Sequence, residues 1–310
     1  MTLPEPTIPD APGGAPLSPI VAGAWRMASW NLDVRGRLRW IEQCLDLGIT
    51  SFDHADIYGD YTVEQLFGDA LATSPGLRQR VQLVTKCGIR LISRQRPSHA
   101  VKSYDTSPDH LVASVEQSLR ALRTDHIDLL LIHRPDALMD PDEVASTFRY
   151  LHDAGKVLHF GVSNHTPSQL ALLHNRLHHH LHHHLALSTN QIEFSPLQLS
   201  ALTDGTLDQC LTLAIRPMIW SPLGGGRVLH GTSDVEQRVR RTLDEVANEL
   251  GVSPATVAYA WILRHPSRPV PITGSGRVEA LREAVAALTL TLSREAWYRI
   301  WQAGAGHEVA

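Results

Sequence analysis

Four side chains suited to proton transfer stand at or just after the ends of short apolar runs of the sequence. Asp53 and Tyr58 follow one such run. Lys86 ends a second run, and His133 ends a third. Carboxylate, phenol, ammonium and imidazole are groups that enzymes use for general acid–base catalysis. A single charged residue at a strand end is usually solvated or structural, so the hypothesis of a catalytic site depends on all four residues meeting at one face of the fold.

A metal centre is the other chemistry to consider for this stretch, because Asp53, His54 and Asp56 are all possible ligands. Neighbouring residues of a strand point to opposite faces, so His54 is turned away from Asp53. No cluster of further histidines lies at the neighbouring strand ends. We therefore expect no metal site, and we expect His54 to be a packed residue. Cys87, next to Lys86, is expected to be a buried structural thiol.

The elements that must position these residues are strands and helices in alternation. Most of the apolar runs are continuous, as expected for parallel strands buried on both faces. Eight β-branched or aliphatic runs recur at residues 20–25, 50–54, 81–86, 127–133, 158–164, 188–194, 217–223 and 270–273. Helix starts are indicated by an N-cap residue followed by proline at Ser107-Pro108, Asp140-Pro141, Thr166-Pro167 and Ser253-Pro254, and helix ends by Gly48, Gly155 and Gly251.

Eight strand–helix units without a linker-like break predict an α/β fold, namely a single (β/α)8 TIM barrel with its active site at the C-terminal face of the strands. A doubly wound sheet is the alternative. Such a sheet usually opens with a glycine-rich phosphate loop after its first strand, and no such loop follows the first apolar run. We assign residues 19–310 to the barrel and residues 1–18, which are rich in proline, to a mobile lead-in.

Seven motifs, in order along the chain, resemble those of the aldo-keto reductases. They occupy residues 51–59 (SFDHADIYG), 83–88 (LVTKCG), 130–135 (LLIHRP), 161–164 (GVSN), 190–193 (NQIE), 220–226 (WSPLGGG) and 271–277 (PITGSGR). The resemblance extends from about residue 20 to the C-terminus. Within the family, the sequence is most similar to the bacterial oxidoreductases of the YdhF type.

The resemblance implies the reduction of an aldehyde or ketone to an alcohol by hydride transfer from a nicotinamide, with Tyr58 as the proton donor. A free phenol has a pKa of about 10 and releases its proton sluggishly near neutrality. Lys86 is implied to lower the pKa of Tyr58, and Asp53 is implied to pair with Lys86. His133 is implied to hydrogen-bond the substrate oxygen and to orient the substrate.

The resemblance also implies which residues bind the cofactor. Ser163, Asn164 and Gln191 match the positions that hydrogen-bond the carboxamide. Trp220 matches the aromatic residue that stacks on the nicotinamide, which is more often tyrosine or phenylalanine in the family. The loop from Ser221 is implied to cover the pyrophosphate, because its glycines let the backbone approach closely. The full set of expected contacts is Gly23, Ala24, Trp25, Asp53, Ser163, Asn164, Gln191, Trp220, Ser221, Pro222, Leu223, Gly224, Gly226, Arg227, Gly274, Ser275, Arg277 and Glu283.

The cofactor expected from this set is NADP(H), with NAD as the weaker alternative. Arg277 is the main cation available for a 2′-phosphate, with Ser275 beside it and Glu283 for the adenine. The segment from Gly274 to Arg277 is expected to open a helix whose N-terminus can hold phosphate. The sequence departs from many relatives here, because they carry a basic residue at the position of Gly274. NAD is therefore less firmly excluded than in a typical relative.

The composition of the sequence indicates which binding partners and which cellular compartment to expect. The net charge of −4 argues against a nucleic-acid partner, which would require a basic face. The first 20 residues have neither the basic start nor the apolar core of a signal peptide, and no apolar run has the length of a membrane span. Three cysteines fit a reducing cytoplasm. We expect a cytoplasmic monomer that acts on a small-molecule carbonyl substrate, without a membrane or nucleic-acid partner.

Two features leave alternatives open. Seven of the 18 histidines lie between His174 and His184. This tract joins a helix to a strand on the face opposite the catalytic one, so we expect a helix end or a solvent loop, with adventitious metal binding as the alternative. The alternative function is a non-catalytic NADP(H)-binding module that senses redox state or docks on a partner, since the fold also serves as a channel subunit.

Overall fold

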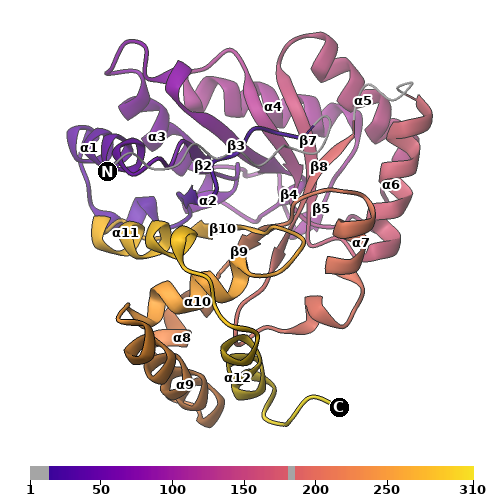
Figure 1. Ribbon diagram of the computed structural model, residues 1–310. Helices are drawn as coiled ribbons and strands as arrows, with labels where there is room; N and C mark the ends of the chain where they lie inside the picture. The colour runs from indigo at the N-terminus through magenta and orange to yellow at the C-terminus, as the bar shows by residue number, and fades with distance from the viewer. Residues whose placement is uncertain (1–13, 181–185) are drawn as a thin grey trace.

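The eight apolar runs pair side by side as parallel strands, and β1 pairs with both β2 and β10, which closes the sheet into a barrel (Figure 1). The computed structural model describes residues 14–180 and 186–310. The strand order is β1-β10-β9-β8-β7-β6-β3-β2. The strands are β1 (Val21–Gly23), β2 (Ser51–Asp53), β3 (Gln82–Cys87), β6 (Ile127–Ile132), β7 (Val157–Ser163), β8 (Leu187–Glu193), β9 (Met218–Trp220) and β10 (Val270–Thr273). The predicted (β/α)8 barrel is confirmed.

Helices surround the barrel and alternate with its strands. The helices that follow successive strands are α1 (Val34–Asp46), α3 (Val63–Leu71), α4 (Pro108–Leu122), α5 (Pro141–Asp153), α6 (Pro167–His180), α7 (Thr206–Thr212), α10 (Pro254–Leu263) and α11 (Val278–Ala286). The predicted N-caps are confirmed at Ser107, Asp140 and Ser253, whose side chains accept hydrogen bonds from backbone amides of the first turn. Gly251 ends a helix in the left-handed conformation, with φ of 66°.

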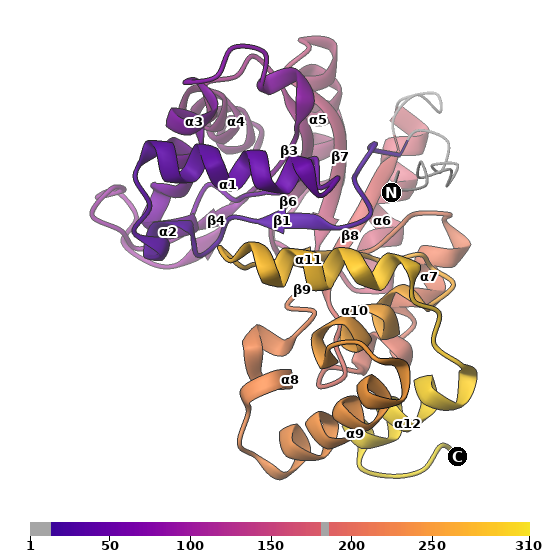
Figure 2. The same ribbon diagram turned by 60° about the vertical axis from the view of Figure 1, so that its left-hand side comes forward.

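Further elements are attached to this frame. They are the helices α2 (Tyr58–Tyr61), α8 (Arg227–His230), α9 (Asp234–Leu250) and α12 (Arg294–Ala305), and the 3-10 turns at Met27–Trp30, Arg78–Arg80, Ser200–Leu202, Gly224–Gly226 and Ala287–Thr289. Figure 2 shows α9, α10 and α12 grouped together near the C-terminus. Between β3 and α4 the chain also forms a hairpin of two short strands, β4 (Ile89–Arg90) and β5 (Ser103–Tyr104). The sequence did not indicate this hairpin, because strands of two residues carry no readable period.

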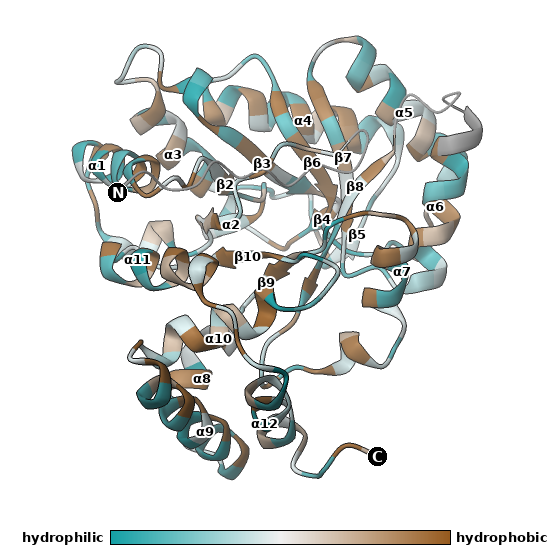
Figure 3. Cartoon of the chain, in the orientation of Figure 1, coloured by the Kyte–Doolittle hydropathy of each residue, from teal (hydrophilic) through white to brown (hydrophobic). Residues whose placement is uncertain are grey.

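Apolar side chains fill the interior of the barrel and the layer between strands and helices. Strands β9 and β10 are brown along most of their length in Figure 3, whereas α1 and α9 carry hydrophobic and hydrophilic residues on different sides. Ala15 and Leu17 pack against the cluster that includes Val21, Val84 and Leu129. Ala15 and Leu17 of the expected lead-in are therefore in contact with the barrel, and residues 1–13 lie outside the described part of the chain.

The histidine tract is described only in part. Helix α6 extends to His180, so the first half of the tract is helical, whereas residues 181–185 lie outside the described residues. The helix runs from the end of β7 toward the start of β8, which places its end opposite the carboxyl ends of the strands. No helix within residues 14–180 and 186–310 combines the length and the apolar character needed to cross a membrane.

A buried carboxylate joins α3 to its neighbours. Glu64, on α3, accepts hydrogen bonds from Thr85 Oγ1 on β3 at 2.6 Å and from Ser118 Oγ on α4 at 3.0 Å. Burial raises the pKa of Glu64 to about 7, and the two hydroxyl donors offset only part of this effect. The native state therefore holds this proton more tightly than the unfolded chain does.

We expect Glu64 to make folding stability depend on pH. Between pH 4.5 and about 7 the native state binds more protons at this group, so the free energy of unfolding falls as pH rises, by roughly 3 kcal/mol. Urea unfolding at about pH 5 and about pH 8 should show this slope in the wild type and a smaller slope in Glu64→Gln. The exposed Glu42→Gln is the control. An equal slope in Glu64→Gln and wild type would contradict the assignment.

Candidate active site

The carboxyl ends of β2 and β3 bring three of the four predicted catalytic side chains together inside the barrel. The Lys86 ammonium donates to Asp53 Oδ2 at 2.8 Å, to Tyr58 Oη at 3.0 Å and to the His54 carbonyl at 2.7 Å. Lys86 and Asp53 are buried, with 1% and 3% of their surface exposed. Because the three donated bonds satisfy the ammonium, the charge is retained in an apolar interior.

Burial and neighbouring charges shift the pKa values of Lys86 and Tyr58 in opposite directions. Burial lowers the pKa of Lys86, but the Asp53 carboxylate and the Tyr58 phenol outweigh burial and raise it, so the ammonium stays protonated. Burial raises the pKa of Tyr58, and the Lys86 ammonium lowers it by a smaller amount. The net result is a raised pKa for Tyr58. Lys86 therefore lowers the pKa of Tyr58 as expected, but burial outweighs this effect.

His133 follows β6 and faces the same phenol. Its ring lies edge-on to the Tyr58 ring, with centroids 5.9 Å apart. Burial lowers the pKa of His133 well below its usual value, and the Lys86 and Arg134 cations add to the effect, so the imidazole is neutral. The next residue was not predicted as part of the site: the Arg134 guanidinium carbon lies 5.9 Å from the centroid of the Trp220 ring. Its position directly after His133 is the sequence signal that could have identified it.

Hydrogen bonds connect the residues predicted to bind the carboxamide to Asp53. Gln191 Nε2 donates to Asp53 Oδ1 at 2.8 Å. Ser163 Oγ donates to the Gln191 carbonyl at 2.9 Å and accepts from Asn164 Nδ2 at 2.7 Å. Trp220 Nε1 donates to Asn164 Oδ1 at 2.9 Å. The indole therefore fixes Asn164, a bond that a phenylalanine at this position could not make.

The segment after β9 is a backbone cradle. Ser221 and Gly224 to Gly226 all have positive φ values, from 51° at Ser221 to 102° at Gly226. Glycine adopts this conformation without strain, and no heavy atom lies within 4 Å of the place where a Cβ of Gly226 would be. Arg227 closes the cradle, because its Nε donates to the Gly224 carbonyl and its Nη1 lies 3.2 Å from Glu236 Oε1. Pro222 and Leu223 lie between Ser221 and these glycines.

The segment after β10 leads into α11 with its predicted polar groups near the surface. Gly274 and Arg277 are exposed, and the Arg277 amide donates to Ser275 Oγ at 3.1 Å. Trp40 Nε1 holds the Ser275 carbonyl at 3.3 Å. The helix begins at Val278, directly after this segment, with Arg277 as its N-cap residue. Glu283 lies on the same helix and is half-buried.

The residues after β1 complete the predicted set. Gly23 ends the strand beside β10, where a Cβ would come within 2.9 Å of Ile272 Cγ2. The Ala24 amide donates to the Asp53 carbonyl at 2.9 Å, which ties this turn to β2. Trp25 is 58% exposed, with the Arg26 guanidinium 5.3 Å from its ring centroid. The predicted residues thus surround one end of the barrel.

The alternative of a metal centre fails on geometry. The Asp53 carboxylate is bonded to Lys86 and Gln191, whereas the His54 ring packs edge-on against Phe67 with centroids 4.5 Å apart. The Asp53 and His54 side chains therefore do not converge on one metal ion.

Burial raises the pKa of the Cys87 thiol well above its usual value, as expected of a structural cysteine.

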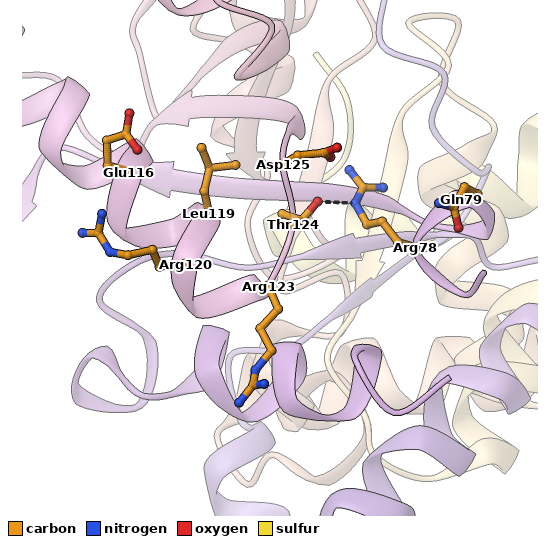
Figure 4. Close-up of a pocket in the computed structure, with 8 residues that line it drawn as sticks. All are labelled: Arg78, Gln79, Glu116, Leu119, Arg120, Arg123, Thr124 and Asp125. Carbon is orange, nitrogen blue, oxygen red and sulfur yellow. Dashed lines mark hydrogen bonds between the residues drawn. The ribbon is translucent and has the colours of Figure 1, made fainter. Parts of the chain in front are cut away.

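An open hollow on the other side of the molecule does not compete with this site. Figure 4 shows it lined by Arg78 and residues of α4, with Arg78 turned toward Thr124. Arg78 donates to Thr124 Oγ1 at 2.6 Å and pairs with Asp128 at 2.8 Å. Arg78 precedes β3 and Thr124 precedes β6, so the hollow lies at the amino ends of the strands, opposite the catalytic residues.

Comparison with known proteins agrees with the geometry. The family model described as "Aldo/keto reductase family" matches residues 19–305. The chain belongs to the aldo/keto reductase family. It is therefore an oxidoreductase.

Individual relatives of this aldo/keto reductase cover nearly the whole chain. It is 51% identical to "Oxidoreductase YdhF" of Escherichia coli (strain K12) over 300 residues, which are 96% of this chain and 97% of that protein. It is 41% identical to the "6-dehydroglucose reductase" of Agrobacterium fabrum (strain C58 / ATCC 33970), over 95% of this chain and 96% of that protein. The expected similarity to YdhF-type oxidoreductases is confirmed.

A solved structure shares the fold. The thermostable aldo-keto reductase Tm1743, crystallised with the inhibitor epalrestat, superposes with a TM-score of 0.76 at 26% sequence identity. The superposition covers 92% of this chain and 95% of that chain. The barrel and its family assignment therefore rest on both sequence and structure.

We expect the Lys86–Asp53 pair to behave as a coupled unit in stability. Asp53→Asn leaves a buried ammonium without its counter-charge and should destabilise the fold by about 3 kcal/mol or more. The double variant Asp53→Asn/Lys86→Met should cost less than the sum of the two single variants, as measured by urea unfolding. The same cycle on the partly exposed pair Arg240–Asp244 is the control and should show a coupling below about 1 kcal/mol. Additive effects at Asp53 and Lys86 would contradict the buried pairing.

Proposed function

We propose that this aldo/keto reductase uses NADP(H) to reduce an aldehyde or ketone to an alcohol, with Tyr58 as the proton donor. The observation that carries the proposal is the contact of one buried ammonium with both the Asp53 carboxylate and the Tyr58 phenol, at 2.8 and 3.0 Å. His133 faces the same phenol with a neutral ring. This set supplies a proton donor, a cation beside it and a neutral imidazole for the substrate oxygen.

The residues present fit a nicotinamide dinucleotide. The amide groups of Asn164 and Gln191 suit a carboxamide, and the flat indole of Trp220 suits an aromatic ring. The left-handed glycines from Gly224 to Gly226 would let backbone approach a pyrophosphate. When bound, the cofactor supplies the hydride.

The chain's own residues then account for the proton and for orientation. Tyr58 Oη would donate its proton to the carbonyl oxygen as negative charge develops there. Lys86, 3.0 Å away, would stabilise the phenolate that remains. Asp53 would keep Lys86 charged and in place, and His133 would hydrogen-bond the same oxygen and hold the carbonyl in line.

The preference for NADP(H) over NAD is part of the proposal. Arg277 is exposed beside Ser275 at the start of α11, where a cation and the helix N-terminus act together on a phosphate. Glu283 on the same helix would face the adenine. In NAD a hydroxyl replaces the 2′-phosphate, so the Arg277 guanidinium would have no anion to bind.

The setting in which the protein works is proposed on similar grounds. All four catalytic side chains come from one chain, which supports a monomer that needs no second subunit to complete its site. Cys44, Cys87 and Cys210 are free and buried, which supports a reducing cytoplasm. The proposed partner is a small carbonyl compound. Since one relative is named 6-dehydroglucose reductase, 6-dehydroglucose belongs in the substrate panel beside simple aldehydes and ketones.

Removal of the proton donor tests the reaction. Tyr58→Phe should lower the rate of NADPH oxidation with the best carbonyl by at least about a hundredfold, because a positioned general acid contributes this much. Binding of NADPH should be unchanged. Tyr104→Phe, in the exposed β5, is the control and should keep full activity. Tight NADPH binding without turnover of any carbonyl by the wild type would favour the non-catalytic alternative.

The 2′-phosphate assignment is tested at Arg277. Arg277→Leu should raise the Kd for NADPH at least about tenfold, because a charge-assisted hydrogen bond is lost, and should leave the Kd for NADH unchanged. Quenching of Trp220 fluorescence measures both affinities. Arg294→Leu, on α12, serves as the charge-matched control. Equal binding of NADH and NADPH by the wild type would contradict the assignment.

A further inference from the structure

The backbone directly after Tyr58 is held in a strained conformation. Gly59, Asp60 and Tyr61 all lie in the left-handed region, with φ values of 57°, 57° and 65°. Glycine adopts this region freely, whereas an aromatic residue rarely does. A strained residue persists only where its surroundings fix it, and such residues gather at functional sites. The contacts of Tyr61 must therefore stabilise this turn.

The loop of the β4–β5 hairpin provides those contacts. The Leu91 amide donates to Tyr61 Oη at 3.0 Å. The Arg96 guanidinium carbon lies 4.4 Å from the centroid of the Tyr61 ring, which is the distance of a cation–π contact. The Leu91 carbonyl in turn bonds His99 Nδ1 at 2.9 Å. The Leu91 amide thus holds the hydroxyl of Tyr61, and the Arg96 guanidinium covers one face of its ring.

The hairpin is itself fixed to the strand that carries Lys86. β4 begins two residues after the end of β3, and Ile89 pairs with Tyr104 across the hairpin. The Asp105 amide donates to the Gly88 carbonyl at 3.0 Å. Arg90 Nη1 lies 3.3 Å from Asp105 Oδ2. One continuous segment therefore positions the Lys86 ammonium at one end and Tyr61 at the other.

We propose that Tyr61 is a positioning residue: anchored on Leu91 and Arg96, it sets the turn that holds the Tyr58 phenol against the Lys86 ammonium. The inference deepens the proposed function, on which it rests. No hydrogen bond or ring contact joins Tyr61 to Lys86 or Tyr58 in the described part of the chain, so Tyr61 acts through the Gly59–Tyr61 turn. Loss of its anchor would let the turn relax toward the favoured backbone region, which would lengthen the distance of 3.0 Å between Lys86 Nζ and Tyr58 Oη.

The ionisation of Tyr58 reports that distance. The charged groups that act on this phenol are Lys86 and Arg134, which favour the phenolate, and Asp53, which opposes it, with the neutral His133 beside its ring. Of these, Lys86 alone bonds the phenol oxygen in the described part of the chain. A longer distance between Lys86 and Tyr58 therefore raises the pKa of the Tyr58 phenol. The fall of the reduction rate at high pH, where Tyr58 loses its proton, then moves to higher pH as well.

The test is Tyr61→Phe, which keeps the ring for Arg96 and removes only the bond to Leu91. We expect kcat to fall about fivefold, the effect of one hydrogen bond, with an unchanged KM for NADPH. The ring-carbon NMR signal of labelled Tyr58, assigned by its absence in Tyr58→Phe, should titrate at higher pH than in the wild type. Tyr104→Phe, in the same hairpin, should change neither quantity.

A second pair of variants tests the backbone itself. Neither Asn nor Val can bond Leu91 as Tyr61 does, but asparagine tolerates the left-handed region and a β-branched residue does not. Tyr61→Asn should therefore keep more kcat than Tyr61→Val. A fall in kcat without a shifted Tyr58 titration in Tyr61→Phe, or no change in either, overturns the proposal. Failure of the wild type to reduce any carbonyl would contradict the proposed function instead, and the NMR titration would still decide the role of Tyr61.

Discussion

A buried ammonium without a counter-charge would be strongly destabilising inside a barrel, and the Lys86–Asp53 pair is the interaction on which the proposed catalytic site depends. Both side chains are almost fully buried, so the charge persists only because its donors are satisfied. The pair requires β2 and β3 to be neighbours in fixed register, with Asp53 opposite Val84. The phenol of Tyr58 then completes the coordination of the ammonium.

The same pair extends its constraint to the cofactor side of the barrel. Asp53 uses its second oxygen to accept from Gln191, on β8, across the barrel interior. Ser163 and Asn164 continue the chain of hydrogen bonds to Trp220, on β9. Strands distant in sequence are thus joined by one polar network, so the proposed hydride and proton steps share a common frame. A polar network in an apolar interior is stable only when its members are satisfied, as they are here.

Two features of the site lie outside the strands. The β4–β5 hairpin lies beside the catalytic turn and holds Tyr61 in a conformation that its own sequence disfavours. The Arg134 guanidinium lies over the Trp220 ring. Burial raises the pKa of Tyr58 despite the adjacent ammonium, since removal of a phenolate from water opposes ionisation more strongly than one cation favours it. Sequence motifs name the groups, whereas the balance between these effects is set by packing.

The sequence by itself determined the eight strands, the N-caps at Ser107, Asp140 and Ser253, and the four side chains of the proposed catalytic site. These follow from local rules: continuous apolar runs, N-cap residues followed by proline, and motifs within single segments. Only the tertiary structure decided the bond between Gln191 and Asp53 and the hairpin anchor of Tyr61. These depend on which distant segments come into contact and how deeply each group is buried, and neither property is encoded in the period or spacing of one segment.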